Sequence, residues 1–200
     1  MANLELRLIN RSHESEVAVV ILQQNLATHF DEIAVAWHVI RLHGRDASYT
    51  FAFPDAIEVA AHDSFGNKTR PQRCSPGQVW SVISRSSGAD LRFEPHSAAK
   101  DEIEVRSGLS NGATNINLYR DGRLFAAKVG VVPGQRAFFR FKPILRMGVT
   151  TDVEEGEILN SASIANFNSE IVLQTGMTHA DLVLTGGSQV PYKFTLVPIK

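Results

Sequence analysis

The chain of 200 residues contains a single cysteine, Cys74, so no disulfide can form within it. Rare, unpaired cysteine is typical of proteins in reducing compartments. Long apolar runs are missing as well. The longest early one, residues 17–22, is much shorter than a membrane-spanning helix or the apolar core of a secretion signal. These two absences predict a cytoplasmic protein without a membrane span.

An excess of charge of one sign is also absent, as are the motifs of common cofactor sites. The sequence has 20 lysines and arginines against 21 aspartates and glutamates, which argues against a surface that coats nucleic acid or anionic membrane. No glycine-rich phosphate loop, H-x-H pair or H-E-x-x-H motif occurs. We therefore expect no cofactor and no metal ion, and nucleic acid is not an expected partner.

Helical periodicity is missing too, because apolar residues do not recur every 3.6 positions over any long window. Instead they alternate in short runs that glycine, proline, asparagine and aspartate interrupt about every ten residues, as in sandwiches and barrels. Hydrophobic residues form 44% of the chain, which is enough for a substantial core. The predicted fold is all-β, a two-layer antiparallel β-sandwich or a flattened barrel with essentially no helix.

Among the predicted strands, segment 33–42 is apolar on both faces, which is typical of a central strand covered on two sides. For 16–23 a helix capped by Ser12 or Ser15 is the alternative. The predicted strands are 4–9, 16–23, 33–42, 49–53, 57–63, 79–85, 90–94, 102–106, 116–120, 123–128, 136–142, 157–164, 170–175, 180–185 and 191–197.

The length suits a single β-rich domain over residues 1–200. A short echo offers an alternative of two similar halves, about 1–110 and 111–200, because PGQVWSV at 76–82 resembles PGQRAFF at 133–139. Pro-Gly suits the centre of a type II turn. Since the residues between the copies do not match, two turns that solve the same local problem explain the echo better than a repeat does.

Asp121-Gly122 gives the clearest local prediction. Asp-Gly between two alternating strands favours a two-residue type I′ hairpin loop, in which both residues have positive φ. Such a loop would place Tyr119 opposite Leu124 and Leu118 opposite Phe125.

One pentapeptide resembles a catalytic motif. The residues from Gly108 to Gly112 satisfy G-x-S-x-G around Ser110, and Asp152 and His179 follow in the chain order of an α/β-hydrolase triad. That fold requires a helix after the motif, but the next segment is a predicted strand. A loop between strands is therefore the better interpretation.

The remaining candidates for chemistry are histidines and Cys74. His38 lies among small apolar neighbours, so it either lines a pocket or is a buried, hydrogen-bonded core residue, which is the commoner case. Adjacent residues of a strand point to opposite faces, so His62 and Asp63 cannot bind one ion together, whereas His179 and Asp181 could share a face. Cys74 is interpreted as an incidental exposed thiol.

A basic run crosses the second half of the sequence, with charge 7 − 1 = +6 in a chain whose net charge is −1. Alternation places Arg136, Phe138, Arg140 and Lys142 on one strand face, where they could bind an anionic partner. The commoner explanation of such a run, and the one the sequence favours, is a solvated face whose charges are balanced by the acidic segment 152–157. The run consists of Arg120, Arg123, Lys128, Arg136, Arg140, Lys142 and Arg146, against Asp121.

Three functions remain open. We favour a non-enzymatic binding module that recognises a small molecule, glycan or peptide, which could be anionic, through the basic strand face or loops. A cofactor-independent enzyme of hydrolase or cyclase type with a His/Asp pair is one alternative, and a self-assembling structural β-protein is another. A homodimer is expected because unprotected sheet edges promote pairing.

Overall fold

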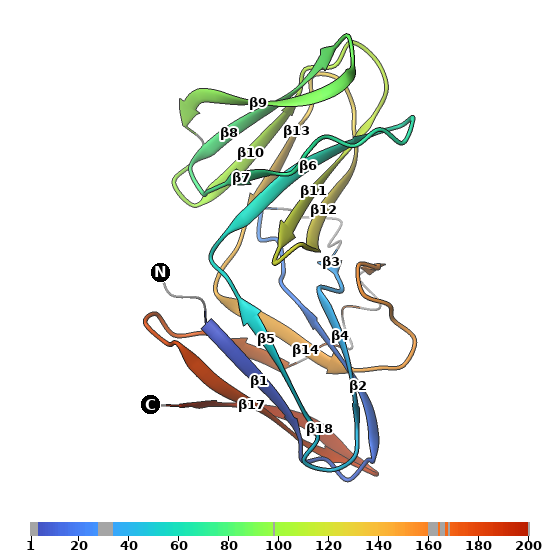
Figure 1. Ribbon diagram of the computed structural model, residues 1–200, viewed down its shortest axis with the longest axis vertical. Helices are drawn as coiled ribbons and strands as arrows, with labels where there is room; N and C mark the ends of the chain where they lie inside the picture. The colour runs from blue at the N-terminus through green and yellow to red at the C-terminus, as the bar shows by residue number, and fades with distance from the viewer. Residues whose placement is uncertain are drawn as a thin grey trace.

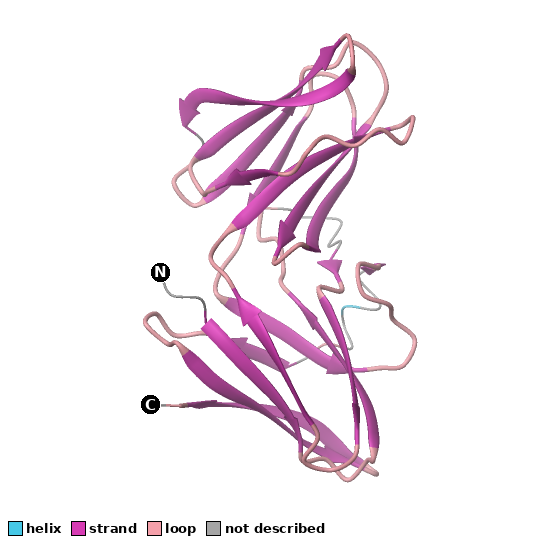
Figure 2. Cartoon of the chain, in the orientation of Figure 1, coloured by secondary structure: helices cyan, strands magenta, loops and turns pink. Residues whose placement is uncertain are grey.

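The computed structural model describes residues 4–27, 34–97, 99–159, 164, 167 and 169–199. Almost all of its regular structure is β, and only Ile164 is helical among the described residues (Figure 2). The all-β prediction is confirmed. The strands are β1 (Leu4–Asn10), β2 (Glu16–Leu22), β3 (Ala34–Val35), β4 (His38–His43), β5 (Ser48–Phe53), β6 (Ile57–Asp63), β7 (Gln72–Cys74), β8 (Gln78–Arg85), β9 (Gly88–Ser97), β10 (Glu102–Ser107), β11 (Thr114–Arg120), β12 (Arg123–Val131), β13 (Arg136–Arg140), β14 (Ile144–Val149), β15 (Ile158–Leu159), β16 (Ser169–Val172), β17 (His179–Gly187) and β18 (Val190–Pro198).

The strands form two sandwiches stacked along the long axis of the molecule (Figure 1). The first sandwich consists of the sheets β18-β17-β1-β5 and β16-β14-β2-β4, and the second consists of β13-β10-β8-β9 and β12-β11-β6-β7. A small sheet of β15 and β3 lies near their junction. The chain enters the second sandwich after β5 and returns to the first before β14, so each four-stranded sheet takes strands from both sides of residue 110.

Most neighbouring strands are antiparallel, as predicted, but two pairs are parallel. The first joins β1 to β17 and the second joins β8 to β10. Parallel pairing requires a long connection. Fifteen other strands separate β1 from β17 in sequence, and β9 provides the crossover between β8 and β10. Short-range alternation does not reveal which distant segments pair, so the sequence could not predict these two pairs.

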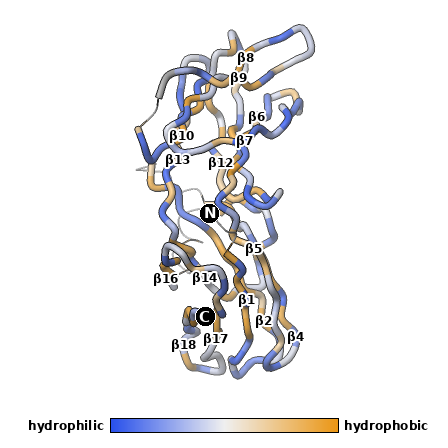
Figure 3. Tube along the Cα trace, turned by 60° about the vertical axis from the view of Figure 1, so that its left-hand side comes forward, coloured by the Kyte–Doolittle hydropathy of each residue, from blue (hydrophilic) through white to orange (hydrophobic). Residues whose placement is uncertain are grey.

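Alternation of burial in β1 follows the sequence pattern closely. Leu4, Leu6 and Leu8 are buried, whereas Glu5 and Arg7 are exposed. Figure 3 shows hydrophobic segments along β1 and β17. One large cluster of buried residues draws on strands of all four larger sheets, which gives the molecule a continuous core.

Segment 33–42 is not the predicted central strand. Within its described part, it forms the short β3 and then β4, which is an edge strand of its sheet. The second apolar face that suggested a central strand is buried in a different way. Ala34 and Ala36 pack into a separate small core with Val20 and Leu22. The prediction of a strand over 16–23 is confirmed by β2, and the helix alternative is wrong there. Of the predicted strand 157–164, residues 160–163 lie outside the described part.

The Asp121-Gly122 hairpin adopts the predicted loop, with φ of 52° at Asp121 and 69° at Gly122. Tyr119 lies opposite Leu124, as expected. Leu118, however, lies opposite Ala126 and not Phe125, because the register shifts between Leu118 and Tyr119. A β-bulge inserts an extra residue on one strand, and alternation alone does not predict it.

Arg120 ties the second sandwich to the first. The sequence pattern groups it with surface cations, but its side chain is buried and lies over the rings of Phe53 and Phe125, with 4.4 Å and 4.9 Å from Cζ to the two ring centroids. Its guanidinium donates a hydrogen bond to the carbonyl oxygen of Pro54. Burial lowers the pKa of Arg120 to about 10, so the group stays protonated at neutral pH. Arg120 is therefore part of the junction between the sandwiches.

Candidate functional site

Three of the four predicted binding residues lie on β13, which is an edge strand of its sheet. Arg136 and Phe138 are exposed and Arg140 is partly buried, whereas the side chains between them face the core. The fourth residue, Lys142, does not belong to this strand. It lies two residues beyond the end of β13, in the connection that returns to the first sandwich.

The arginines of β13 face acidic side chains on the neighbouring strand β10. Arg136 Nη1 lies 3.2 Å from Oε1 of Glu104, and the same oxygen accepts a hydrogen bond of 2.7 Å from Nε of Arg106. Arg140 Nη1 lies 3.6 Å from Oε1 of Glu102. The register explains these pairs, because Glu104 lies opposite Phe138 and Glu102 lies opposite Arg140. Acids of the same sheet therefore balance the charge of this face.

The acidic segment 152–157 has a smaller part in balancing the run than the sequence suggested. Among the cations of the run, only Arg123 pairs with this segment in the described part of the chain, at 2.9 Å from Nε to Oε1 of Glu155. Arg146 pairs elsewhere, with Glu170. In the described part of the chain, Lys128 and Lys142 are the two cations of the run that have neither an ion pair nor the buried position of Arg120.

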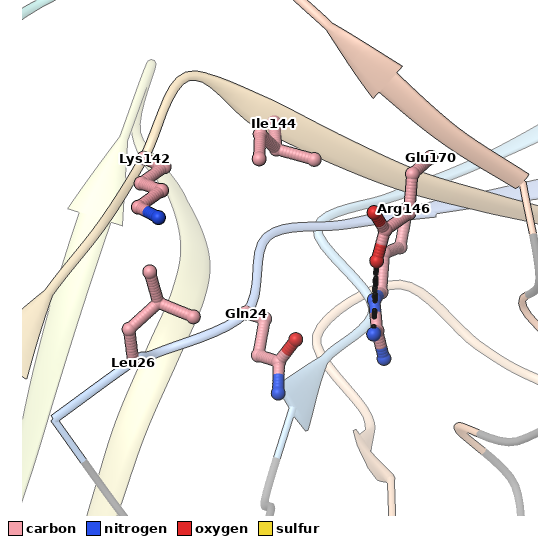
Figure 4. A pocket seen from close by; sticks show the side chains of 6 residues that line it. All are labelled: Gln24, Leu26, Lys142, Ile144, Arg146 and Glu170. Atoms are coloured by element: carbon pink, nitrogen blue, oxygen red, sulfur yellow. Dashed lines mark hydrogen bonds and ion pairs between the residues drawn. The ribbon is translucent and has the colours of Figure 1, made fainter.

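Lys142 borders a hollow of about 110 Å³ near the junction of the sandwiches (Figure 4). One wall consists of every second residue from 142 to 146, in β14 and the residues that lead into it. The side chains of Lys142, Ile144 and Arg146 point to the same side. Gln24 and Leu26 form the opposite wall, from the segment that follows β2. The six lining residues are Gln24, Leu26, Lys142, Ile144, Arg146 and Glu170.

Hydrogen bonds to the backbone of β13 hold the segment of Asn25 and Leu26 against the free edge of this strand. The side-chain amide of Asn25 donates to the carbonyl oxygen of Phe138 over 2.9 Å, and its oxygen accepts from the backbone N–H of Arg140 over 2.9 Å. Leu26 N–H then donates to the carbonyl oxygen of Arg140 over 2.8 Å. Asn25 thus occupies the place of a neighbouring strand, and the shape of the hollow is fixed by the fold.

The hollow carries one net positive charge from its lining, since two cations face one carboxylate (2 − 1 = +1). Arg146 donates from Nε and Nη2 to Oε1 of Glu170 over 3.2 Å and 3.0 Å. A guanidinium has five N–H donors, so this pair leaves others for a ligand. The carbonyl oxygen of Lys142 accepts a hydrogen bond of 2.6 Å from Nε2 of Gln23, which fixes the backbone at this residue. The Lys142 side chain itself is exposed. The arrangement suits a single carboxylate or phosphate oxygen.

His38 is buried, as the sequence favoured, with 2% of its surface exposed, but the expected hydrogen bonds of its ring nitrogens are not formed with described residues. It packs on the rings of Trp37 and Phe51, 4.3 Å and 4.8 Å between centroids. Its Nδ1 lies 3.8 Å from Oε2 of Glu155, too far for a hydrogen bond, and Nε2 has no hydrogen-bond partner among the described residues. Burial, with the nearby charge of Arg123, lowers the pKa of His38 to about 4. These two effects outweigh the distant carboxylate.

The three residues suggested by the G-x-S-x-G motif do not assemble into a triad. Ser110 lies in the loop before β11, Asp152 follows β14 and His179 begins β17, so they occupy separate elements in two sandwiches. The segment after the motif is a strand, as the sequence predicted, and not the helix that a hydrolase requires. His179 Nε2 lies 4.0 Å from Glu5, whereas Asp181 is bound by Arg7.

His62 and Cys74 each have a local structural environment. Nε2 of His62 lies 3.3 Å from the hydroxyl of Tyr119 on the adjacent strand. The pKa of His62 is lowered mainly by burial and, to a smaller extent, by the positive charge of Lys68. Cys74 is buried, so the expectation of an exposed thiol is wrong. Burial, helped by Glu58, raises the pKa of Cys74 to about 12. The sequence could not show this because β7 has only three residues, which is too few for an alternating pattern that would place Cys74 on the core face.

No protein-family model matches the chain, and no curated protein or solved structure is significantly similar to it. Within the described ranges, no group of three or more His, Cys, Asp or Glu residues is placed to hold a metal ion. None of the described helical structure is long and apolar enough to span a membrane.

Proposed function

We propose that this protein is a non-enzymatic recognition module that binds an anionic group of a peptide or small molecule in the Lys142 hollow. The observation that carries the proposal is the state of Lys142. It is a cation beside a preformed hollow and forms no ion pair with a described residue, whereas every arginine of the same run other than the buried Arg120 faces an acid.

The face of β13 extends this site toward the second sandwich. Phe138 is 38% exposed between Arg136 and Arg140, and it offers an apolar contact to the remainder of the partner. Both arginines keep N–H donors that their acids do not occupy. In the proposed complex, Lys142 therefore contacts the anionic group, and Arg136, Phe138 and Arg140 contact the rest of the partner molecule.

A hydrolase or cyclase with a His/Asp pair has less support. No histidine forms an ion pair with an aspartate in the described part of the chain. Histidine approaches glutamate in His43–Glu16 at 3.6 Å and His179–Glu5 at 4.0 Å, which are exposed pairs at the surface, and in His38–Glu155 at 3.8 Å, where the histidine is closed off from solvent. The cytoplasmic location, the homodimer and the self-assembling alternative stay predictions. Sedimentation of the purified protein at micromolar concentration tests the two assembled states.

The test uses two peptide probes that differ in one charge. Acetyl-Ala-Phe-Ala-Ala with a free carboxylate and the same peptide with a terminal amide are titrated into the protein, with sodium acetate and inorganic phosphate as minimal anions. Binding is followed by NMR shifts of the backbone amides of Leu26, Lys142 and Ile144. We expect the acid to bind and the amide to bind roughly tenfold more weakly.

Lys142→Ala and Lys128→Ala are the matched variants, since both remove an unpaired lysine of the same run. Lys142→Ala should abolish the preference for the acid, and Lys128→Ala should keep it. Added salt should weaken the acid complex by screening. Equal binding of acid and amide, equal effects of the two variants, or no response to any of the four anions or peptides would each refute the proposal.

A further inference from the structure

The far end of the second sandwich carries a second concave surface, formed by three loops. They connect β6 to β7, β8 to β9 and β10 to β11. A hollow of about 230 Å³ is lined by Phe65 from the first of these loops, by Asn111 from the third, and by the strand ends that flank the second, including Ser84 near the end of β8. These loops lie at the end of the molecule remote from the first sandwich (Figure 1), so this surface is separate from the Lys142 hollow.

Phe65 is the most exposed large hydrophobic residue among those described, at 83% of its surface. Its loop is nevertheless well ordered by hydrogen bonds. The carboxylate of Asp63 accepts from the backbone N–H of Phe65 over 2.9 Å, from that of Asn67 over 2.9 Å and from the Asn67 side chain over 2.8 Å. Gly66 completes the turn with φ of 87°. The backbone that carries the ring is thus ordered before any ligand arrives, which lowers the entropic cost of binding.

The groups around the ring are mostly uncharged. Ser64, Ser84, Asn67 and Asn111 line the hollow, and the side chains of Ser84 and Asn111 form no hydrogen bond with a described residue. The nearby guanidinium of Arg85 is already paired with an acid outside the lining, Asp90. An exposed aromatic ring is therefore surrounded by hydroxyl and amide groups that each donate and accept.

This combination distinguishes between partner classes. A protein interface usually surrounds an aromatic anchor with further apolar contacts, and Phe65 is the only large exposed hydrophobic residue in the described lining. The two charged groups of the lining, Asp63 and Arg85, have opposite sign and are both already engaged, so the lining offers no net charge to a strongly charged ligand. A sugar ring has an apolar C–H face that an aromatic ring can cover, and hydroxyl groups that pair with serine and asparagine.

The size of the hollow agrees with one end of a longer chain. Its volume of about 230 Å³ lies below the roughly 300–1,000 Å³ of pockets that enclose a drug-sized ligand. We propose that the Phe65 loop end is a binding site for neutral oligosaccharides, with Phe65 stacking on a sugar ring and Asn67, Ser84 and Asn111 bonding its hydroxyl groups. This site does not depend on the anion site at Lys142.

The test titrates the full chain with cellohexaose, maltohexaose and xylohexaose, with the anionic hexamer of galacturonic acid as a charged comparator. NMR signals of the Phe65 backbone amide and of the Asn67 and Asn111 side-chain amides report on the site. At least one neutral hexaose should shift all three signals. Phe65→Ala should weaken that sugar roughly tenfold or more, whereas Phe65→Trp should retain it.

Tyr49→Ala is the matched control, because it removes a different exposed aromatic ring, from the first sandwich. It should bind the sugar like the unaltered protein, and unchanged thermal unfolding should accompany both alanine variants. The proposal is overturned if none of the three neutral sugars shifts the signals, if only the galacturonic acid hexamer does, or if the sugar binds Phe65→Ala as well as it binds the original chain. Binding of the acid-terminated tetrapeptide at this loop in place of a sugar would overturn it too.

Discussion

The indole Nε1 of Trp37 donates a hydrogen bond to the carbonyl oxygen of Arg120 over 3.2 Å, and this bond joins the two sandwiches inside the protein. Trp37 directly precedes β4 of the first sandwich, and Arg120 is the last residue of β11 in the second sandwich. Both groups are buried, so water cannot replace either partner if the other is removed.

Trp37→Phe should therefore destabilise the protein by more than the loss of ring volume alone. The change leaves the Arg120 carbonyl without this donor, a cost of about 1–3 kcal/mol. Trp80→Phe is the control, because the Nε1 of Trp80 is buried with no hydrogen-bond partner in the described part of the chain. Urea unfolding should give the larger loss for Trp37→Phe. Equal losses would show that the bond contributes nothing.

The buried imidazole of His38 should make the protein sensitive to acid. Its pKa is lowered to about 4 in the folded state, from an ordinary value near 6.5, and the charged groups that face it are Glu155 and Arg123. As the pH falls below about 6.5, the unfolded chain binds the proton first, so stability is lost between about pH 6.5 and pH 4. The full loss amounts to about 3 kcal/mol.

Measuring the unfolding free energy of the unaltered protein and of His38→Gln at pH 7 and at pH 4 isolates this contribution. The variant should be less stable at pH 7, since it loses ring contacts, but its loss on acidification should be smaller. His62 also has a lowered pKa and adds an acid loss common to both proteins. Parallel pH curves for the two proteins would contradict the assignment to His38.

Much of the fold could be predicted from alternation, and the reasons for the failures are physical. Period two located β1, the density of β-branched residues located β2, and Asp-Gly between alternating strands located the hairpin, because each signal depends on neighbours in sequence. The short strand β7 and strand β14 were missed, since three residues give too little pattern and ILRMGV alternates weakly. The division into two sandwiches depends on pairings between distant strands, which the local pattern does not contain.

For the candidate site, sequence identified the cations but not their surroundings. Alternation correctly placed Arg136, Phe138 and Arg140 on one face, yet the acids that balance them lie on β10, more than thirty residues earlier. The Lys142 hollow depends on the segment after β2, whose contact with β13 runs through the side chain of Asn25. No local signal could have revealed that contact.

Gly122 has a left-handed backbone conformation that favours glycine and strains β-branched residues, with φ of 69° and no atom within contact distance of an added Cβ. Gly122→Val should destabilise the fold by roughly 1 kcal/mol or more, entirely through the backbone. Gly122→Asn should cost less, because asparagine tolerates positive φ. Thermal unfolding of the two variants tests this order, and an unchanged melting temperature for Gly122→Val would contradict it.

Cys74 should be chemically silent in the folded protein. Its buried thiol has a pKa raised to about 12, so almost no thiolate exists at pH 8, and the thiolate is the reactive form. An aromatic disulfide reagent should release no chromophore from the native protein and one equivalent after unfolding in urea, since the chain has one cysteine. Rapid reaction of the native protein would mean that Cys74 becomes exposed through local opening of β7.

The double variant Arg136→Ala/Arg140→Ala separates the two possible uses of the basic strand face. Both arginines are exposed enough for solvent to screen their ion pairs, and Glu104, which is only 5% exposed, keeps its 2.7 Å bond from Arg106. Stability should therefore change by about 1 kcal/mol or less. Binding of the acid-terminated peptide should weaken, but less than in Lys142→Ala, because Lys142 faces the hollow directly. Urea unfolding and the same NMR titration measure the two effects on one sample. A loss of several kcal/mol with unaltered binding would mean that these arginines serve the sheet and not a partner.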